Sequence, residues 1–374
     1  MSGAAATCVG IGLARFAFVP LFPALVTAGW VSGAEAGLLG AAALAGYVGG
    51  AAAAQRLARR LGTRRALAIG MMGAFISLLF SAIPGGLPWL LPWRLLAGVA
   101  GGVLMSLAGP AVQRAVPAAQ RGAASGIVVS GVGGGIILGA GALPGLLLWG
   151  PSAGWLGIAG FTALLWLFAQ RRFPDDPATS GAGLPPPHVP GLIWAYILSG
   201  AGMVPHMVYL ADLAARGFGM GVSAGAGLWL VFGLGALVGT LSGGRIADRV
   251  GGARAVRLWL GVQIMAVMLA LVPWWPALAL AAALGGFSGV GVSAVTLAWT
   301  RESAGLAAGA LWVRVTIAYA MAQALGALAL AALFGATGES HAAVFSVGLA
   351  LSVGALLAAT APGRPGGNCP APAA

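Results

Sequence analysis

The chain has 374 residues, of which 60% are hydrophobic and only 7% are charged. Soluble domains carry about 25% charged residues, so this composition excludes an ordinary soluble protein. The net charge of +12 comes from arginine alone, since the chain has no lysine; these arginines lie in short turns between apolar runs, as in membrane topology, and no nucleic-acid partner is expected.

Twelve apolar segments of about the 20 residues that cross a bilayer follow one another along the chain. In the first half they are 5–28, 35–54, 66–83, 88–111, 122–146 and 153–170. In the second half they are 190–213, 223–243, 255–272, 276–298, 305–334 and 341–361. Because lipid offers no partner to unpaired backbone groups, we expect an all-α membrane protein with twelve transmembrane helices. The first run continues through Arg15, which favours a membrane helix over a cleaved signal peptide.

One long polar connection divides the chain. Residues 171–189 are polar and rich in proline, and they separate six apolar segments from six. We therefore expect an N-terminal six-helix bundle (1–170), a cytoplasmic linker (171–189) and a C-terminal six-helix bundle (190–361). Residues 362–374 are rich in glycine, proline and alanine and are expected to be a disordered cytoplasmic tail.

The arginines predict the orientation. One set of turns and the C-terminal tail hold fifteen of them, namely Arg56, Arg59, Arg60, Arg64, Arg65, Arg114, Arg121, Arg171, Arg172, Arg245, Arg249, Arg254, Arg257, Arg301 and Arg364. The turns on the other side hold only Arg216. By the positive-inside rule, both termini should lie in the cytoplasm. Tryptophans gather at the predicted outer ends, as in an aromatic belt: Trp30, Trp89, Trp93, Trp149, Trp155, Trp274 and Trp275.

A charged stretch occurs in two similar copies in the sequence. Gly244–Gly251 reads GRIADRVG, and Gln55–Gly62 reads QRLARRLG about 190 residues earlier. The second copy keeps the acid Asp248, whereas the first has Arg59 at that place. Each copy follows the second apolar segment of its half, and each is predicted to be a short turn. Glycines recur at the same offset, which indicates a parallel repeat of six helices.

These residues resemble the major facilitator superfamily. Gly244–Gly251 is similar to its loop signature G-x-x-x-D-R-x-G, and Arg94–Gly98 is similar to its R-x-x-x-G element. The opening stretch 10–18 and the stretch 316–326 resemble the bacterial YbfB/YjiJ-like branch. The resemblance implies two pseudo-symmetric six-helix bundles that move a solute by alternating access. The glycine-rich fifth segment lacks the Gly-Pro step of the family's antiporters, so exchange with a counter-ion is not implied.

Three arginines fall inside predicted helices, namely Arg15, Arg94 and Arg314. An arginine near the middle of a bilayer costs about 2.5–3.5 kcal/mol on insertion scales, so each should face the bundle interior or water. Each is either a buried hydrogen-bond anchor or part of an anion site; Arg15 and Arg314 are predicted to bind substrate, and Arg94 to act in coupling or structure. Since no acid lies at comparable depth, the site suits an organic anion.

Further polar residues are candidates for the cavity, with simple packing as the alternative. His206, Tyr47, Tyr319 and Gln323 are predicted to bind substrate, and Asp212 to act in coupling. His206 is the group at membrane depth with a near-neutral reference pKa, so it or Asp212 would carry a coupled proton. Tyr196 and Tyr209 belong to the same set of candidates.

The two charged copies are predicted to act as a gate. The motif residues Gly244, Asp248, Arg249 and Gly251 should latch the halves, with Asp248 against the start of the fifth helix and Arg121 close by. On the symmetric side, Arg56, Arg59 or Arg60 should pair with Glu302. Glycines in the fifth and eleventh segments either allow close packing or let those helices slide.

The sequence thus predicts a secondary transporter, monomeric and in a bacterial inner membrane, whose partners are a small-molecule solute, the lipid bilayer and protons. Its solute would be an organic anion or an amphipathic metabolite. The alternatives are a permease for drugs or sugars with a neutral or cationic substrate, and a channel or non-transporting sensor. No enzyme constellation is present, and no cofactor or metal is expected; Cys8 and Cys369 have neither disulfide nor metal-site spacing.

Overall fold

The computed structural model of the chain describes residues 1–117, 121–173 and 187–361. Eleven stretches of it are helical, long and apolar enough to cross a membrane. One of these, Trp275–Ala336, contains two long helices joined by a 3₁₀ turn at Gly305–Ala307. The described chain therefore has twelve spanning segments, and the expected all-α membrane fold is confirmed.

The first spanning segment is broken into α1 (Ser2–Thr7), a π-helical stretch η1 (Cys8–Leu13) and α2 (Phe18–Thr27). The rest of the first half is α3 (Gly33–Leu61), α4 (Thr63–Phe80), α5 (Gly86–Ala115), α6 (Arg121–Leu146) with the 3₁₀ turn η3 (Leu147–Trp149), and α7 (Pro151–Ala169). The seventh segment is also broken, into α8 (Pro190–Gly202), α9 (Val204–Asp212) and η4 (Leu213–Gly217). The chain ends with α10 (Val222–Val250), α11 (Gly252–Ala270), α12 (Trp275–Ala304), α13 (Ala308–Ala336) and α14 (His341–Thr360).

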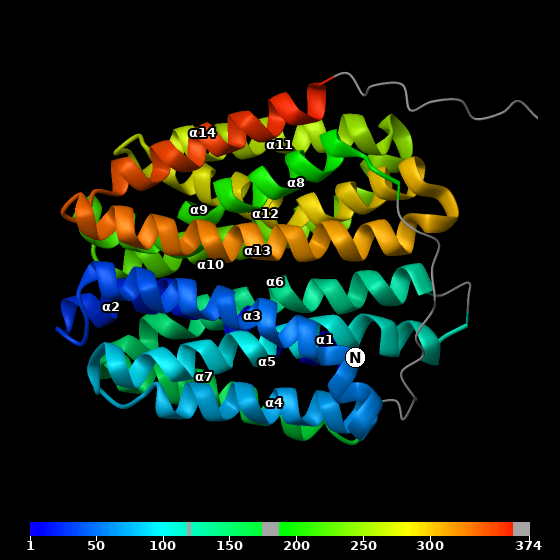
Figure 1. Cartoon of the computed structure of the whole chain (residues 1–374). Helices are drawn as coiled ribbons and strands as arrows, with labels where there is room; N and C mark the ends of the chain where they lie inside the picture. The colour runs from blue at the N-terminus through cyan, green and yellow to red at the C-terminus, as the bar shows by residue number, and fades with distance from the viewer. Residues whose placement is uncertain (118–120, 174–186, 362–374) are drawn as a thin grey trace, which may run out of the picture.

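The two halves of the chain form two bundles that lie side by side. Figure 1 shows α1 to α7, from blue to green, on one side and α8 to α14, from green to red, on the other. The bundles meet along two lines, where α3 packs against α13 and α6 packs against α10. The linker 174–186 and the tail 362–374 lie outside the described residues.

The predicted bounds are close to the observed ones except at the end that carries most of the arginines, which we call the arginine-rich end. There α3, α10 and α12 continue to Leu61, Val250 and Ala304, six or seven residues past the predicted ends. Polar residues such as arginine and glutamine favour a helix as well as leucine does, so leaving the apolar zone does not end it. The prediction that 55–62 and 244–251 are turns is therefore wrong, because most of each stretch is helix.

The two copies of the charged stretch end in the same backbone conformation. Gly62 has φ 85° and ψ 150°, and Gly251 has φ 85° and ψ 148°. Each amide donates a hydrogen bond to the residue four earlier, Ala58 or Ala247. Because this region of φ and ψ is accessible almost only to glycine, the final glycine of each copy is what turns the chain into the next helix.

Glycines bring pairs of helices within each half into backbone contact. A Cβ atom added to Gly98 of α5 would collide with the carbonyl of Ala43 in α3. At the matching place in the second half, a Cβ on Gly286 of α12 would collide with the carbonyl of Phe232 in α10. Small residues permit this approach where lipid gives no hydrophobic drive. The closest packing thus joins α3 to α5 and α10 to α12.

The glycines of the fifth helix divide into two groups. Gly131 and Gly135 of α6 face the backbone of the first spanning segment, at Ala4 and Cys8. By contrast, a Cβ added to Gly134 or Gly141 of the same helix would meet no atom of another element within 4 Å. Packing therefore accounts for some of the glycines that the sequence singled out in this helix, but not for all of them.

One predicted member of the aromatic belt lies elsewhere. Trp149 and Trp274 are 84% and 62% exposed, as a belt requires. Trp155, in contrast, is fully buried and stacks on Phe18 at a centroid distance of 6.4 Å. The position of Trp155 four residues inside α7 turns its ring toward the bundle core instead of the headgroup layer.

Candidate functional site

The middle of the molecule is built on the two broken helices. In the first spanning segment the backbone leaves the helix at residues 14–17, where the amide of Phe16 bonds back to Ile11 rather than to a residue four earlier. In the seventh segment the break is at Met203, followed by Pro205 in the first turn of α9. Irregular backbone at membrane depth persists where protein groups satisfy it, and broken helices of this kind frame substrate sites in transporters.

Arg94 of α5 satisfies the first break. Its Nη1 donates to the carbonyl of Ala14 at 2.8 Å, and its Nη2 donates to the carbonyl of Arg15 at 3.3 Å. The guanidinium lies over the rings of Phe18 and Trp155, at 4.5 and 5.6 Å from their centroids. Arg94 is only 1% exposed. It is therefore a buried anchor whose donors point at the backbone, which is one of the two alternatives that the sequence left open.

Arg15 lies beside it, between the halves. Its Nη2 donates to Oε1 of Gln323 in α13 at 3.3 Å and approaches Sδ of Met207 in α9 at 3.8 Å. The guanidinium also lies 4.9 Å from the ring centroid of Phe16 and 5.6 Å from that of Tyr47. All four partners are neutral. Within the described chain, no carboxylate pairs with Arg15.

The second half faces Arg15 with an amide and a set of rings. Nε2 of Gln323 donates to the hydroxyl of Tyr319 at 3.2 Å. The ring of Tyr319 stacks on that of Tyr196 at a centroid distance of 4.2 Å, and Tyr196 lies 6.0 Å from Trp312. The hydroxyl of Tyr196 is 2.9 Å from that of Ser293. The structure thus brings together Arg15, Tyr47, Tyr319 and Gln323, four of the six predicted substrate residues.

The other two predicted substrate residues lie elsewhere. Arg314 is nine residues from Gln323 on α13, which is about two and a half turns and therefore the opposite face. It is exposed, beside Val313 and Ile317, which are 56% and 49% exposed. His206 is fully buried in the second half, with its ring 5.4 Å from that of Phe345 and next to Gly285. Neither side chain contacts Arg15 or Gln323.

The centre is tightly closed on one side of Arg15. A cavity of about 10 Å³ lies there, lined by Arg15, Phe18, Val19, Gly40, Ala43, Leu44, Arg94, Met207 and Val208. A single water needs about 10–15 Å³ on such a measure. This side of the site therefore has room for about one water and not for a solute.

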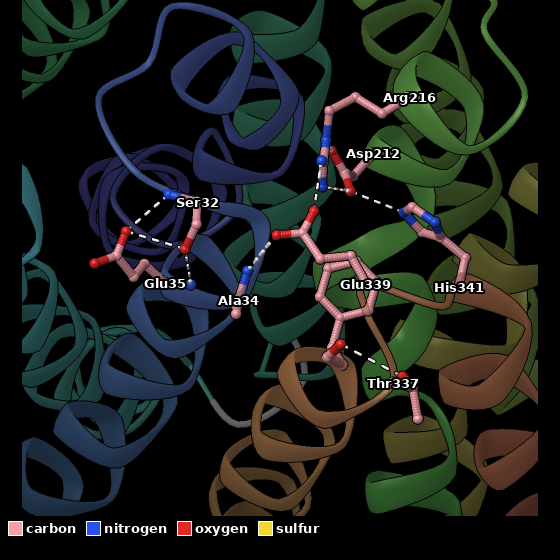
Figure 2. A network of polar contacts seen from close by, with 9 residues as sticks. Ser32, Ala34, Glu35, Asp212, Arg216, Thr337, Glu339 and His341 are labelled. Carbon is pink, nitrogen blue, oxygen red and sulfur yellow. Dashed lines mark hydrogen bonds and ion pairs between the residues drawn. The ribbon is translucent and has the colours of Figure 1, made fainter.

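A charged network closes the end opposite the arginine-rich one. Figure 2 shows Asp212, Arg216, Glu339 and His341 of the second half gathered beside the start of α3. Arg216 binds both oxygens of Asp212, at 2.6 and 2.7 Å, and Oε2 of Glu339 at 2.7 Å. Nε2 of His341 lies 2.8 Å from Oδ2 of Asp212. Asp212 is fully buried, so its charge is balanced by the partners that surround it.

One contact of this network joins the two halves. The backbone amide of Ala34, in the first turn of α3, donates to Oε1 of Glu339 at 3.1 Å (Figure 2). The first amides of a helix lack partners within it and favour an anion. Ser32 and Glu35 form a capping box at the same helix start, but within one half. Glu339 and His341 were not predicted from the sequence, although the four-residue spacing of Asp212 and Arg216 is typical of an ion pair on a helix.

At the arginine-rich end, the predicted pairing of Glu302 with the first charged copy is not made in this structure. Asp248 and Arg249 are exposed at the end of α10. The side chain of Arg121 lies outside the described residues, so the contact between it and Asp248 stays a prediction. Oε1 of Glu302 accepts a hydrogen bond from the amide of Gly252 at 2.7 Å, within the second half. In the part of the chain described, no ion pair joins Glu302 to Arg56, Arg59 or Arg60, and this part of the prediction is wrong for this conformation.

Residues 7–359 match a protein family described as "Uncharacterised MFS-type transporter YbfB". No curated protein matches the chain in sequence. Among solved structures, the xylose transporter XylE from E. coli, in a partially occluded inward-open conformation, is 16% identical, with a TM-score of 0.71 over 95% of each chain. A D-xylose–proton symporter is 15% identical, with a TM-score of 0.74 over 96% of each chain. At such low identity, these two structures show a common fold.

Proposed function

Since the chain belongs to the family of YbfB-like transporters of the major facilitator superfamily, we propose that it is a secondary transporter of a small organic anion. We propose an anion because of the surroundings of Arg15. Its charge lies between the two halves, its partners are the neutral groups of Gln323, Met207, Phe16 and Tyr47, and the described chain supplies no carboxylate to it. An uncompensated charge at membrane depth is unfavourable, so a bound anion would relieve it.

The transport cycle would alternate the side on which Arg15 is reached. The two halves contact each other at the middle of the molecule and at the end where Glu339 binds Ala34. The cavity beside Arg15 has room for about one water. In this proposal, the structure represents the state that faces the arginine-rich end. Opening the other side requires Glu339 to leave Ala34, and Tyr209 of α9 to leave Gly37 of α3, against which its hydroxyl packs. Asp248 would then close the arginine-rich end.

The arginine distribution supports the orientation. The protein is a multi-pass membrane protein, and we propose a bacterial inner membrane with the arginine-rich end and both termini in the cytoplasm. The bundles 1–170 and 190–361 would be the moving bodies, and a monomer contains the whole site. The energy would come from a gradient of the solute or of protons, since the sequence shows no ATP-binding motif.

The groups best placed for proton coupling are those of the network rather than His206. At the closed end, Asp212 and Glu339 bind Arg216, and His341 binds Asp212, whereas His206 is packed inside the second half against Phe345. Any proton that binds to Glu339 weakens its contact with both Arg216 and Ala34. Coupling by this route would tie proton binding directly to opening.

A screen on purified full-length protein tests the proposal. Thermal stability is measured with anionic, cationic and neutral solutes, and each solute that stabilises the protein is then tested for saturable uptake into proteoliposomes. We expect anions to stabilise the protein, and Arg15→Gln to lose that response. Arg314→Gln, which removes an arginine away from the site, is the matched control. Stabilisation by neutral or cationic solutes alone would contradict an anion site.

The same measurements separate a carrier from its alternatives. A channel gives uptake that does not saturate and no counterflow, and a sensor binds a ligand without moving it. A neutral sugar would be bound by the hydroxyl and amide groups of Tyr319 and Gln323 and would be indifferent to Arg15→Gln. Counterflow that saturates and depends on Arg15 is the result that we expect.

A further inference from the structure

Only one positive charge at the centre of the described chain is available to a ligand, that of Arg15. Arg94 and Arg15 lie close together, but Arg94 directs both Nη atoms to the carbonyls of residues 14 and 15. Its Nε is buried without a partner in the described chain, and the residue is only 1% exposed. Because Arg94 is buried in this way, a ligand cannot reach it in this structure. An anion at this site meets one guanidinium, which matches one negative charge.

Two donor groups of Arg15 have no protein partner. Both of its hydrogen bonds use Nη2. Nη1 and Nε make none with the described chain, and neither is among the fully buried polar atoms without a partner, so each keeps some accessible surface. Nη1 and Nε do not share an edge of the guanidinium, so a carboxylate that binds in a bidentate manner uses one of them together with Nη2 and displaces the contact of Nη2 with the Met207 sulfur. The sulfur of Met207, by comparison, is a weak acceptor.

Rings from both halves surround the Arg15 guanidinium. The first half supplies Phe16 and Tyr47, each within 6 Å of the Arg15 guanidinium. The second half supplies Tyr319, which Gln323 links to Arg15, and behind it Tyr196 and Trp312. Three of these side chains are only partly buried, namely Tyr47, Tyr319 and Trp312. Part of the surface of each therefore remains available for contact with a ligand.

The aromatic residues of α13 extend from Gln323 toward one end of the molecule. Tyr319 precedes Gln323 by four residues and Trp312 precedes it by eleven, which at a rise of 1.5 Å are about 6 and about 16 Å along the helix axis. Both lie toward the arginine-rich end, away from the closed cavity at Gly40 and Val208. A ligand whose charged group reaches Arg15 from that end would lay its body along Tyr319.

From this arrangement we propose that the transported anion is a monocarboxylate with a planar aromatic body. Its carboxylate binds the Arg15 guanidinium in place of the Met207 sulfur, and its ring packs against Tyr319 and Tyr47. This inference rests on the proposed function and adds the substrate class. Aromatic faces prefer offset-stacked or edge-to-face contact with one another, which a saturated body of equal size cannot make.

The arrangement also argues against two related classes. An amino acid carries an ammonium group beside its carboxylate, and the described chain has no carboxylate beside Arg15 to pair with that group. A dicarboxylate would bring a second charge, which Arg94 cannot bind in this structure because it is only 1% exposed and directs both Nη atoms to backbone carbonyls. Charge and shape therefore select a single carboxylate on a flat apolar body.

The test compares three probes on the full-length protein in detergent by equilibrium dialysis. Benzoate has the ring and the charge, cyclohexanecarboxylate has the charge and size without a flat ring, and benzamide has the ring without the charge. We expect benzoate to bind about 2- to 10-fold more tightly than cyclohexanecarboxylate. We expect it to bind about 10- to 100-fold more tightly than benzamide, since hydrogen bonds to a charged group are stronger.

Variants connect the preference to the residues. Tyr319→Leu should abolish the advantage of benzoate over cyclohexanecarboxylate while both still bind, and Arg15→Lys should weaken both carboxylates alike. Trp194→Leu is the control, because Trp194 is a ring on α8 that is 57% exposed and outside the site. Thermal melting establishes that each variant is folded. The comparison of probes on the unaltered protein does not depend on any variant.

The outcomes distinguish this inference from the function on which it rests. If the two carboxylates bind equally, or if the saturated one binds better, the aromatic class is wrong and the anion transporter stands. If an amino acid or a dicarboxylate binds more tightly than benzoate, the inference is likewise overturned. If neither carboxylate binds while benzamide does, the anion site itself is wrong.

Discussion

Arg94 donates from Nη1 to the carbonyl of Ala14 at 2.8 Å and so ties α5 to the point where the first spanning helix breaks. The carbonyl of Ala14 has lost its ordinary helical partner at this break, and water is scarce at that depth. The bond therefore stabilises an irregular backbone that lipid alone would not tolerate. Arg15 is positioned as a result, because the break fixes the direction of its side chain.

Replacing this anchor should destabilise the protein. In Arg94→Gln the shorter amide cannot reach both carbonyls, and an unsatisfied buried acceptor costs about 1–3 kcal/mol. We expect a lower melting temperature in detergent and less folded protein by size-exclusion chromatography. Arg15→Gln is the matched control, since its side chain makes no backbone bond, and its melting temperature should stay close to that of the parent. Equal melting temperatures of the two variants would contradict a stabilising role for the bonds from Arg94 to the backbone.

Breaking the contact between Glu339 and Ala34 should open the closed end. Glu339→Ala removes the ion pair to Arg216 and the bond to the start of α3. Hydrogen bonds to charged groups contribute about 1.5–3 kcal/mol, so the open state should gain about tenfold or more in population. The measurement is the rate at which a cysteine placed at Val208, next to Gly40 of the other half, reacts with a membrane-impermeant thiol reagent added on that side, with Cys8 and Cys369 changed to serine.

Glu35→Ala is the control for that experiment. Glu35 is an acid at the same helix start, but it bonds to Ser32 within one half, at 2.7 Å to the backbone amide. Its loss weakens a capping box and leaves the contact between the halves intact. The labelling rate at position 208 should therefore respond to Glu339→Ala and not to Glu35→Ala. A similar increase in both would mean that fraying of α3, rather than release of the halves, exposes the site.

The close helix pairs should not accept a methyl group. Gly98→Ala places a Cβ against the carbonyl of Ala43, and overpacking of this kind costs about 1–3 kcal/mol. Gly49→Ala, on the partner helix α3, meets no atom within 4 Å and should be neutral or stabilising, because alanine favours a helix by about 0.8–1 kcal/mol over glycine. Melting temperatures of the two purified variants check this, and destabilisation by both would indicate a general intolerance of α3 and α5.

The paired glycines that end the charged copies should respond equally to mutation. Gly62→Ala and Gly251→Ala meet no neighbouring atom within 4 Å, so the penalty is conformational and about 1–3 kcal/mol in each. Gly244→Ala, inside α10 with open space around it, should be tolerated. Chemical or thermal unfolding of the three variants gives the comparison. If only one of the pair is destabilised, the two turns are not equivalent despite their matching angles.

Much of the fold followed from the apolar pattern, and the departures have definite causes. Segment length predicted twelve spans, and the repeat of Gln55–Gly62 at Gly244–Gly251 predicted the parallel halves. Hydropathy could not show that α10 runs on through Asp248, because it reports where lipid ends and not where a helix ends. Nor could it show the break at residues 14–17, which depends on Arg94 from another helix.

The site was predicted in part for a similar reason. Arg15, Tyr319 and Gln323 were found because polar groups at membrane depth must face the interior. Arg314 satisfied the same rule by residue type, yet its position about two and a half turns from Gln323 turns it to the other face of α13. Glu339 was predicted only as an acid in a loop. Its partner in the other half is the backbone amide of Ala34, and since nearly every residue has such an amide, the sequence does not indicate which one binds.

The pair of Asp212 and Arg216 has a consequence for biogenesis. In the orientation proposed above, Arg216 must cross the lipid to reach the far side, against the tendency of positive charge to stay behind. Its bidentate partner lies four residues earlier on the same helical turn, so the two charges can cancel while the hairpin is still being threaded, before Glu339 has been synthesised. Asp212→Asn should leave the arginine uncompensated during translocation. We therefore expect that variant to insert with the segment 190–222 partly inverted, as glycosylation or reporter fusions at Met220 would reveal.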